Sequence, residues 1–124
     1  MFAIANMGDK YVDRGDPADN DFTVGDFTID GDWHDLDLTG IVPKGNLPVH
    51  FVLFGHENAG NKWIWIRKKG QTNNRNVCIL HTQQANIYGE LFDFVVCDSD
   101  CKIEYKIDAS TWGALVFTVR GWLV

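Results

Sequence analysis

The chain has 124 residues, which is enough for one domain with a hydrophobic core and too few for two. Residues 1–37 hold ten Asp against Lys10 and Arg14, a local charge of −8, so the rest carries +2 of the total of −6. This balance argues against nucleic acid as a partner of the N-terminal part. No apolar run approaches the roughly 18 residues of a membrane helix, so we expect no membrane insertion.

The start of the chain has neither a basic region nor a long apolar stretch, so we expect no secretory signal. Three Cys is an odd number, and a chain of this length folds without disulfides. We therefore expect mostly free thiols and synthesis in a reducing compartment.

Residues 1–21 are interpreted as an N-terminal arm or acidic loop. The apolar residues 2–7 are typical of an arm or an edge strand, and residues 13–21 are polar and rich in turn formers. Arg14-Gly15-Asp16 spells the integrin tripeptide, but three residues recur often by chance. The Asp spacing allows at most a weak calcium loop without the EF-hand pattern, and a solvated acidic loop is the preferred interpretation.

Further along, apolar residues alternate with polar ones in short segments that turn signals separate, which is typical of strands. The Asp30-Gly31 pair favours a hairpin after residues 26–29. Residues 49–55 are apolar on both faces and therefore predicted to be central. Ile64 and Ile66 share one face of the segment 62–68, opposite Trp63, Trp65 and Arg67. The remaining predicted strands are residues 22–24, 33–38, 76–81, 88–96, 102–107 and 114–124.

The final segment, residues 114–124, is predicted to be a central strand because it runs to the last residue without polar fraying. One face holds Leu115, Phe117, Val119 and Leu123, and the other holds Val116, Thr118, Arg120 and Trp122. Gly121 falls on the first face, where it indicates a bulge or a close backbone approach. The sequence as a whole predicts an all-β fold, an antiparallel β-sandwich that is jelly-roll-like with about eight strands.

The residues that bear chemistry form no convincing catalytic set. Cys78, His81, Cys97 and Cys101 have a passable zinc spacing, but residues three apart on a strand point to opposite faces. The short turn between Cys97 and Cys101 allows a disulfide between them, which would stay open in a reducing compartment. Both serines, Ser99 and Ser110, lie in turns, and no nucleophile elbow or phosphate-binding loop is present. We predict no enzyme activity, no zinc site and no cofactor.

Two aromatic faces are the best candidate sites. Trp63, Trp65 and Arg67 lie opposite the isoleucines of their segment, and Arg120 and Trp122 lie opposite Phe117 and Val119. A single sandwich core does not bury both faces of a strand. Each such face is therefore a subunit interface, a sugar-stacking platform or, after all, core, and we rank interface first and sugar second.

Four stretches resemble small β-sandwich domains of bacteriophage tail-fibre-like and environmental uncharacterised proteins. They are residues 30–43 (DGDWHDLDLTGIVP), 66–70 (IRKKG), 103–106 (IEYK) and the closing pair Gly121-Trp122. The resemblance spans residues 26–124 and depends on order and spacing. Cys101 and residues 9–21 have no counterpart in it.

The resemblance implies a trimeric jelly-roll head, of the general shape of tumour-necrosis-factor-like folds, whose chain ends in a central strand. It implies no catalytic residues. We therefore expect a non-enzymatic virion-type structural or receptor-binding domain that forms a homo-oligomer, with three-fold symmetry favoured by the resemblance alone. A free-standing carbohydrate-binding module or lectin is the alternative, and a metal-assisted hydrolase is a distant third. The expected location is a virion if a phage encodes the chain, and otherwise the cytoplasm.

Overall fold

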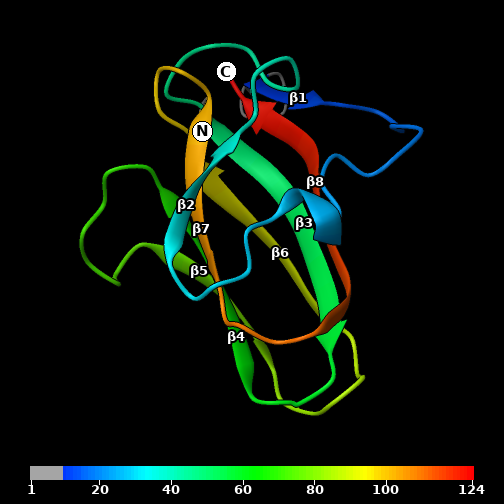
Figure 1. The fold of residues 1–124 in the computed structure, drawn as a ribbon. Coiled ribbons are helices and arrows are strands. Elements are labelled where there is room, and N and C mark those ends of the chain that lie inside the picture. The colour runs from blue at the N-terminus through cyan, green and yellow to red at the C-terminus, as the bar shows by residue number, and fades with distance from the viewer. Residues whose placement is uncertain (1–9) are drawn as a thin grey trace, which may run out of the picture.

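The computed structural model describes residues 10–124, which form eight strands and one short 3-10 helix (Figure 1). The strands are β1 (Tyr11–Asp13), β2 (Trp33–Asp37), β3 (Pro48–Glu57), β4 (Lys62–Lys68), β5 (Val77–Thr82), β6 (Gly89–Val96), β7 (Lys102–Ile107) and β8 (Trp112–Leu123), and the 3-10 helix is η1 (Val24–Asp26). The predicted arm at residues 2–7 lies outside the described residues. Within residues 10–124, no helix has the length and apolar character needed to cross a membrane.

The strands form two antiparallel four-stranded sheets, which confirms the predicted all-β sandwich. The first sheet has the order β1-β8-β3-β6 and the second has the order β2-β7-β4-β5. The first strand thus pairs with the eighth, the second with the seventh, the third with the sixth and the fourth with the fifth. A long hairpin that is wound around itself gives this order, which is the jelly-roll topology.

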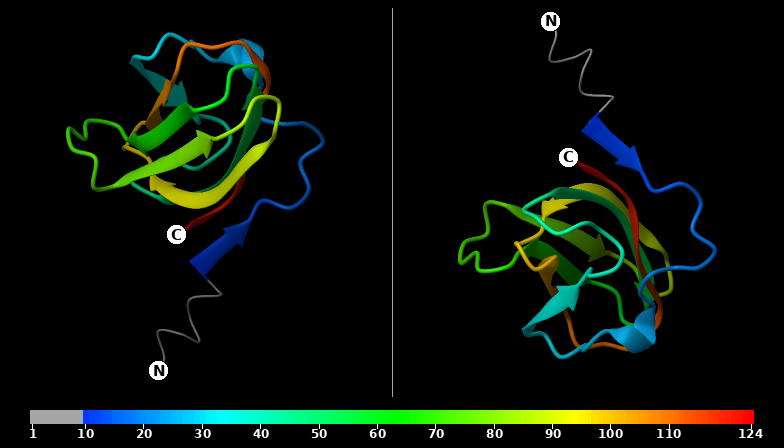
Figure 2. Two further views of the ribbon diagram at one scale, coloured as in Figure 1. Left: turned by 90° about the horizontal axis from the view of Figure 1, so that it is seen from below. Right: turned by 90° about the horizontal axis from the view of Figure 1, so that it is seen from above.

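The core lies between the two sheets, which curve over one another (Figure 2). Alternate residues of β3 and β7 point into it, because successive side chains of a strand point to opposite faces. Phe51 stacks on Phe117 with ring centroids 5.0 Å apart, and Phe27 meets Tyr105 edge-on at 5.1 Å. The predicted inward residues Leu36, Leu38, Ile64, Ile66, Ile103, Tyr105 and Ile107 are all buried.

Strand β8 is central, as predicted: it pairs with β3 along its length and with β1 at its end. Leu115, Phe117 and Val119 are buried in the core, but the predicted face of Leu123 and Trp122 is wrong. The register with β3 shifts between His50 and Phe51, so the phase of β8 changes before its last residues. Trp122 consequently packs against the core.

The segment between residues 22 and 32 differs from its prediction. Residues 26–29 form no strand, and β2 pairs with β7 rather than with them. The Asp30-Gly31 turn is nevertheless present: Gly31 has a φ of 81°, and its N–H donates to the main-chain oxygen of Ile107. Phe22 makes a single bridge to Phe117 on the edge of β8 and packs against the core.

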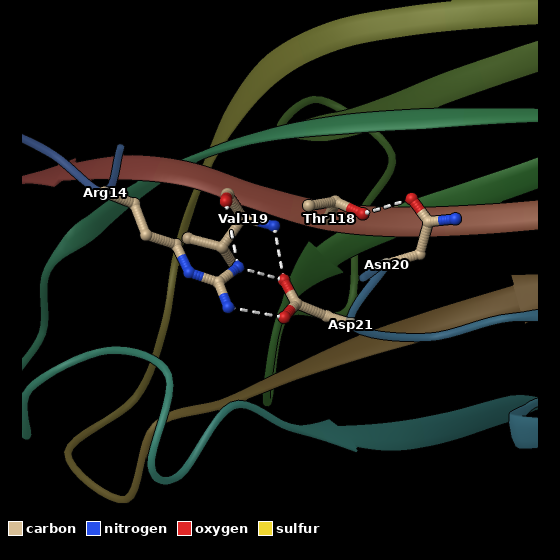
Figure 3. Close-up of polar contacts among 5 residues, drawn as sticks. All are labelled: Arg14, Asn20, Asp21, Thr118 and Val119. Carbon is tan, nitrogen blue, oxygen red and sulfur yellow. Dashed lines mark hydrogen bonds and ion pairs between the residues drawn. The ribbon is translucent and has the colours of Figure 1, made fainter. Parts of the chain in front are cut away.

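Residues 14–21, which we call the N-terminal strap, loop outward beside the edge of β8 where that strand has no neighbour (Figure 2). Arg14 and Asp21, the two ends of the strap, meet at Val119 (Figure 3). Both guanidinium Nη atoms of Arg14 bind the Asp21 carboxylate, and Nη1 also donates to the Val119 carbonyl oxygen at 3.1 Å. Asp21 Oδ2 accepts the Val119 N–H at 2.8 Å. The two side chains therefore satisfy both main-chain groups that a neighbouring strand would otherwise bind.

Candidate binding faces of the two sheets

The outer side of the second sheet carries the tryptophans that the sequence singled out. Trp63, Trp65 and Arg67 of β4 point away from the core, opposite the buried Ile64 and Ile66. The register brings neighbours from the flanking strands beside them, because directly paired residues share a face. We call this surface the tryptophan face; it comprises Trp33, Trp63, Trp65, Arg67, Ile79, His81, Glu104 and Lys106.

The tryptophans of this face are stacked within the molecule. Trp63 lies parallel to His81 at a centroid distance of 3.7 Å and to Trp65 at 6.0 Å. The Lys106 ammonium lies over Trp65 at 4.4 Å and over Trp33 at 5.3 Å. The Arg67 guanidinium lies 3.6 Å from the centre of Trp33. Each of the three tryptophans therefore has two ring or cation partners.

The charged groups of the tryptophan face are also paired internally. Arg67 Nε donates to Glu104 Oε1 at 2.8 Å, and both side chains are largely shielded from water. A sugar platform needs a flat ring face that is open to the ligand, whereas these rings already stack on neighbours. The face is thus better suited to stabilising its own sheet than to stacking a sugar.

The other two predicted site residues, Arg120 and Trp122, do not join the tryptophan face. They lie on β8, in the opposite sheet, and the bulge separates them from each other. Trp122 packs on the core, whereas Arg120 is exposed and its guanidinium lies 5.0 Å from the ring centre of Phe92.

The outer side of the first sheet is the more exposed apolar surface. Phe92 and Phe94 of the edge strand β6 are 50% and 43% exposed. Phe92 pairs with Val52 and Phe94 with His50 across the strands. We call this surface the phenylalanine face; it comprises His50, Val52, Phe92, Phe94, Val116, Thr118 and Arg120.

His50 adds little charge to the phenylalanine face. Its ring stacks on Phe94 at 4.6 Å, and its Nδ1 pairs with the Tyr11 hydroxyl at 3.1 Å. Burial, followed by the nearby charge of Arg120, lowers the pKa of His50 below its ordinary value of 6.5. The imidazole is therefore neutral at pH 7, which leaves Arg120 as the charged side chain of this face.

The three cysteines are free thiols and do not converge with His81. Cys97 and Cys101 are buried, and their Sγ atoms donate to main-chain carbonyls of residues 42–47. Cys78 lies on β5 and donates to the Phe94 carbonyl oxygen at 3.3 Å. Within residues 10–124, no three His, Cys, Asp or Glu side chains are grouped as metal ligands.

Part of the acidic N-terminal segment is bound to β8 rather than surrounded by solvent. Asp21 is nearly buried, with its side chain 6% exposed, rather than solvated as the preferred interpretation held. Arg14 is committed to Asp21 and Val119, so the guanidinium of the Arg14-Gly15-Asp16 tripeptide is not available to a partner in this conformation. Asp16 and Asp19 are exposed, as expected of a solvated loop.

Known families and curated proteins offer no relative. No family model matches the chain, and no curated protein matches it.

Sequence reasoning identified the outward phase of β4 and missed the phenylalanine face as a site. The signal was present: alternation in residues 88–96 sets Phe92 and Phe94 on one phase and Leu91 and Asp93 on the other. Leu91 packs on the core, so the phenylalanines point outward. Asp93 shares the inward phase and is exposed at the edge of the sandwich, which obscured which phase was the core.

Proposed function

We propose that the protein is a non-enzymatic structural or receptor-binding domain of the fibre-head type, which assembles as a homo-oligomer through the phenylalanine face. The observation that supports this most strongly is the exposure of Phe92 and Phe94 side by side on the outer face of the first sheet. Their exposed parts alone come to about 140–230 Å², if a whole aromatic side chain is taken as 150–250 Å². Exposed apolar side chains that lie next to one another on a soluble protein often belong to an interaction site.

A second copy of the chain is the partner that fits this face without an additional component. Closure by rotational symmetry covers the same patch on every subunit and leaves no sticky surface. The jelly-roll topology agrees with the resemblance to tail-fibre domains, and that resemblance alone favours three subunits over two. A virion location follows from the same resemblance and is part of the proposal.

The predicted interface on the tryptophan face becomes the second choice. Its three tryptophans are each less exposed than Phe92 and Phe94, so a partner covers a smaller fraction of each ring there. The phenylalanine face offers two rings that are 50% and 43% exposed, which leaves apolar area for a partner to cover.

Light scattering at micromolar concentration tests the assembly. We expect a mass three times 14.0 kDa. A mass of one chain at every concentration would contradict the proposal. Gene neighbours that encode tail or capsid proteins would support the fibre-head function, and neighbours of carbohydrate metabolism would favour the alternative of a free lectin.

A further inference from the structure

A cavity of about 280 Å³ opens at the end of the sandwich where β5 leads into β6. It is lined by His81, Thr82, Gln83, Gln84, Ile87, Tyr88 and Gly89. In Figure 1 this is the lower end, where the loop that follows β5 lies beside the loop that follows β3. Ligand pockets for drug-sized molecules span about 300–1,000 Å³, so this one suits a smaller ligand, about one ring in size.

A buried carboxylate, that of Glu57, holds the loop that forms part of the cavity wall. Glu57 is fully buried and accepts hydrogen bonds from the N–H groups of Ala59 and Gly60 and from the hydroxyls of Thr82 and Ser110. Its own main-chain oxygen accepts the Asn86 N–H at 2.7 Å. The loop of residues 83–88 is therefore anchored before any ligand arrives, which lowers the entropic cost of binding.

The side chains on the outer side of this anchored loop are exposed and unusually apolar. Ile87 is 58% and Tyr88 is 60% exposed, the highest values among the larger apolar side chains within β5, β6 and their connection. The Tyr88 ring is oriented by His56 at 4.6 Å and by Phe54 at 5.9 Å. An anchored loop that holds an aromatic ring out to water is typical of a binding site.

The polar side chains of the cavity are hydroxyls, amides and the imidazole of His81. Thr82 is occupied by Glu57, and His81 Nε2 pairs with Asn61 Oδ1 at 2.7 Å. The amides of Gln83 and Gln84 are exposed and supply both donors and acceptors. A ligand that suits this lining has an apolar face for the tyrosine and a rim of hydroxyls for the amides.

We propose that this cavity binds a neutral sugar ring, with Tyr88 stacking on its apolar face and Gln83 and Gln84 binding its hydroxyls. The inference rests on the receptor-binding part of the proposed function and names a neutral glycan as the receptor class. It also moves the sugar site from the tryptophan face, where the rings are already stacked, to a ring that is open to solvent.

Nuclear magnetic resonance of the ¹⁵N-labelled full chain tests the proposal. The probes are the methyl glycosides of glucose, galactose and mannose, each titrated to about 50 mM, and sialic acid as a charged comparison. At least one neutral glycoside should shift the side-chain amide signals of Gln83 and Gln84. The Tyr88→Ala and Gln84→Ala variants should weaken that binding at least about tenfold.

The matched control is Asp13→Ala, which alters the second cavity, of about 380 Å³, lined by Tyr11, Asp13, Pro17 and Arg120 among others. The affinity of the Asp13→Ala variant for the neutral glycoside should match that of the unmodified protein. No shift with any neutral glycoside, binding of sialic acid alone, or undiminished binding by Tyr88→Ala would overturn the proposal. The mass of the assembly is measured on the same samples, so failure of the sugar site is distinguished from failure to assemble.

Discussion

The carboxylate of Asp21 accepts the main-chain N–H of Val119 while it holds the guanidinium of Arg14, which binds the Val119 carbonyl oxygen. Two side chains from the N-terminal strap thus occupy one rung of the ladder that β8 would form with a further strand (Figure 3). This arrangement protects the edge of the central C-terminal strand from pairing with other chains.

Replacing Asp21 should therefore cost stability. In Asp21→Ala, the Val119 N–H and the partly buried Arg14 guanidinium lose their acceptor, and we expect the free energy of unfolding to fall by about 2–3 kcal/mol. Urea denaturation followed by tryptophan fluorescence measures the change. Asp19→Ala, on the same strap but exposed, is the control and should stay within about 0.5 kcal/mol of the unmodified protein. Equal stability of the two variants would show that the strap contributes nothing.

Glu57 should make stability depend on acid pH. Burial by itself raises the pKa of its carboxyl, but hydrogen bonds from Ala59, Ser110, Gly60 and Thr82 outweigh burial and hold the pKa below its ordinary value of 4.5. A carboxyl whose pKa is lower when folded stabilises the fold above its ordinary value, and this stabilisation is lost as the pH falls through the folded value.

The Glu57→Gln variant should be less stable than the unmodified protein at pH 7, and the difference should shrink as the pH falls from about 4.5 to 3. Thermal unfolding followed by circular dichroism measures the stability of both proteins at each pH. Glu90→Gln, at an exposed position in β6, serves as the control. It should change neither the stability at pH 7 nor the way stability depends on pH. A gap between Glu57→Gln and the unmodified protein that stays constant with pH would contradict the role assigned to the carboxylate.

Gly121 should not tolerate a side chain. An added Cβ would overlap the Tyr11 hydroxyl and the Val12 carbonyl oxygen, which belong to the neighbouring strand β1. Gly121→Ala should therefore displace β1 from β8 and destabilise the fold by about 1–3 kcal/mol. Hydrogen exchange at Val12 and Trp122 reports the loss of pairing. Gly25→Ala, where no atom lies within 4 Å of the added Cβ, should leave that exchange unchanged.

All three thiols should react slowly in the folded protein. Burial, with the nearby charge of Asp93, raises the pKa of Cys78 to about 12, and burial also raises the pKa of Cys101. The thiolate is the reactive form, so few molecules carry it at Cys78 or Cys101 at pH 8. Cys97 is fully buried, which keeps the reagent away from its sulfur. Titration with a chromogenic disulfide reagent should show no fast-reacting thiol in native buffer and three in urea. One fast thiol in native buffer would contradict the positions assigned to the cysteines.

The fold could be predicted from local patterns because most strands alternate cleanly. Ile64 and Ile66, and Ile103 and Ile107, lie on the inward phase that their sequence indicates. Trp122 could not be assigned in this way, because a bulge in β8 reverses the phase, and a bulge depends on the pairing with β3 rather than on the residues of one strand. Gly121 was the one residue of this strand that indicated the bulge.

The candidate sites were less predictable than the fold. The sequence placed Trp63 and Trp65 on an outer face, but their stacking on His81 and Lys106 depends on which strands are neighbours. The role of Asp21 was invisible for the same reason, since its partner Val119 lies 98 residues away. Contacts between distant segments are set by topology, and one strand's composition does not encode them.

The most direct test of the proposed assembly compares two matched substitutions on the two outer faces. Phe94 on the phenylalanine face is 43% exposed, and Ile79 on the tryptophan face is 42% exposed, so each accepts a lysine without damage to the core. Sedimentation velocity at micromolar concentration should show the trimer for the unmodified protein and for Ile79→Lys, and a single chain for Phe94→Lys. A trimer that persists in Phe94→Lys and dissociates in Ile79→Lys would contradict the assignment of the interface to the phenylalanine face.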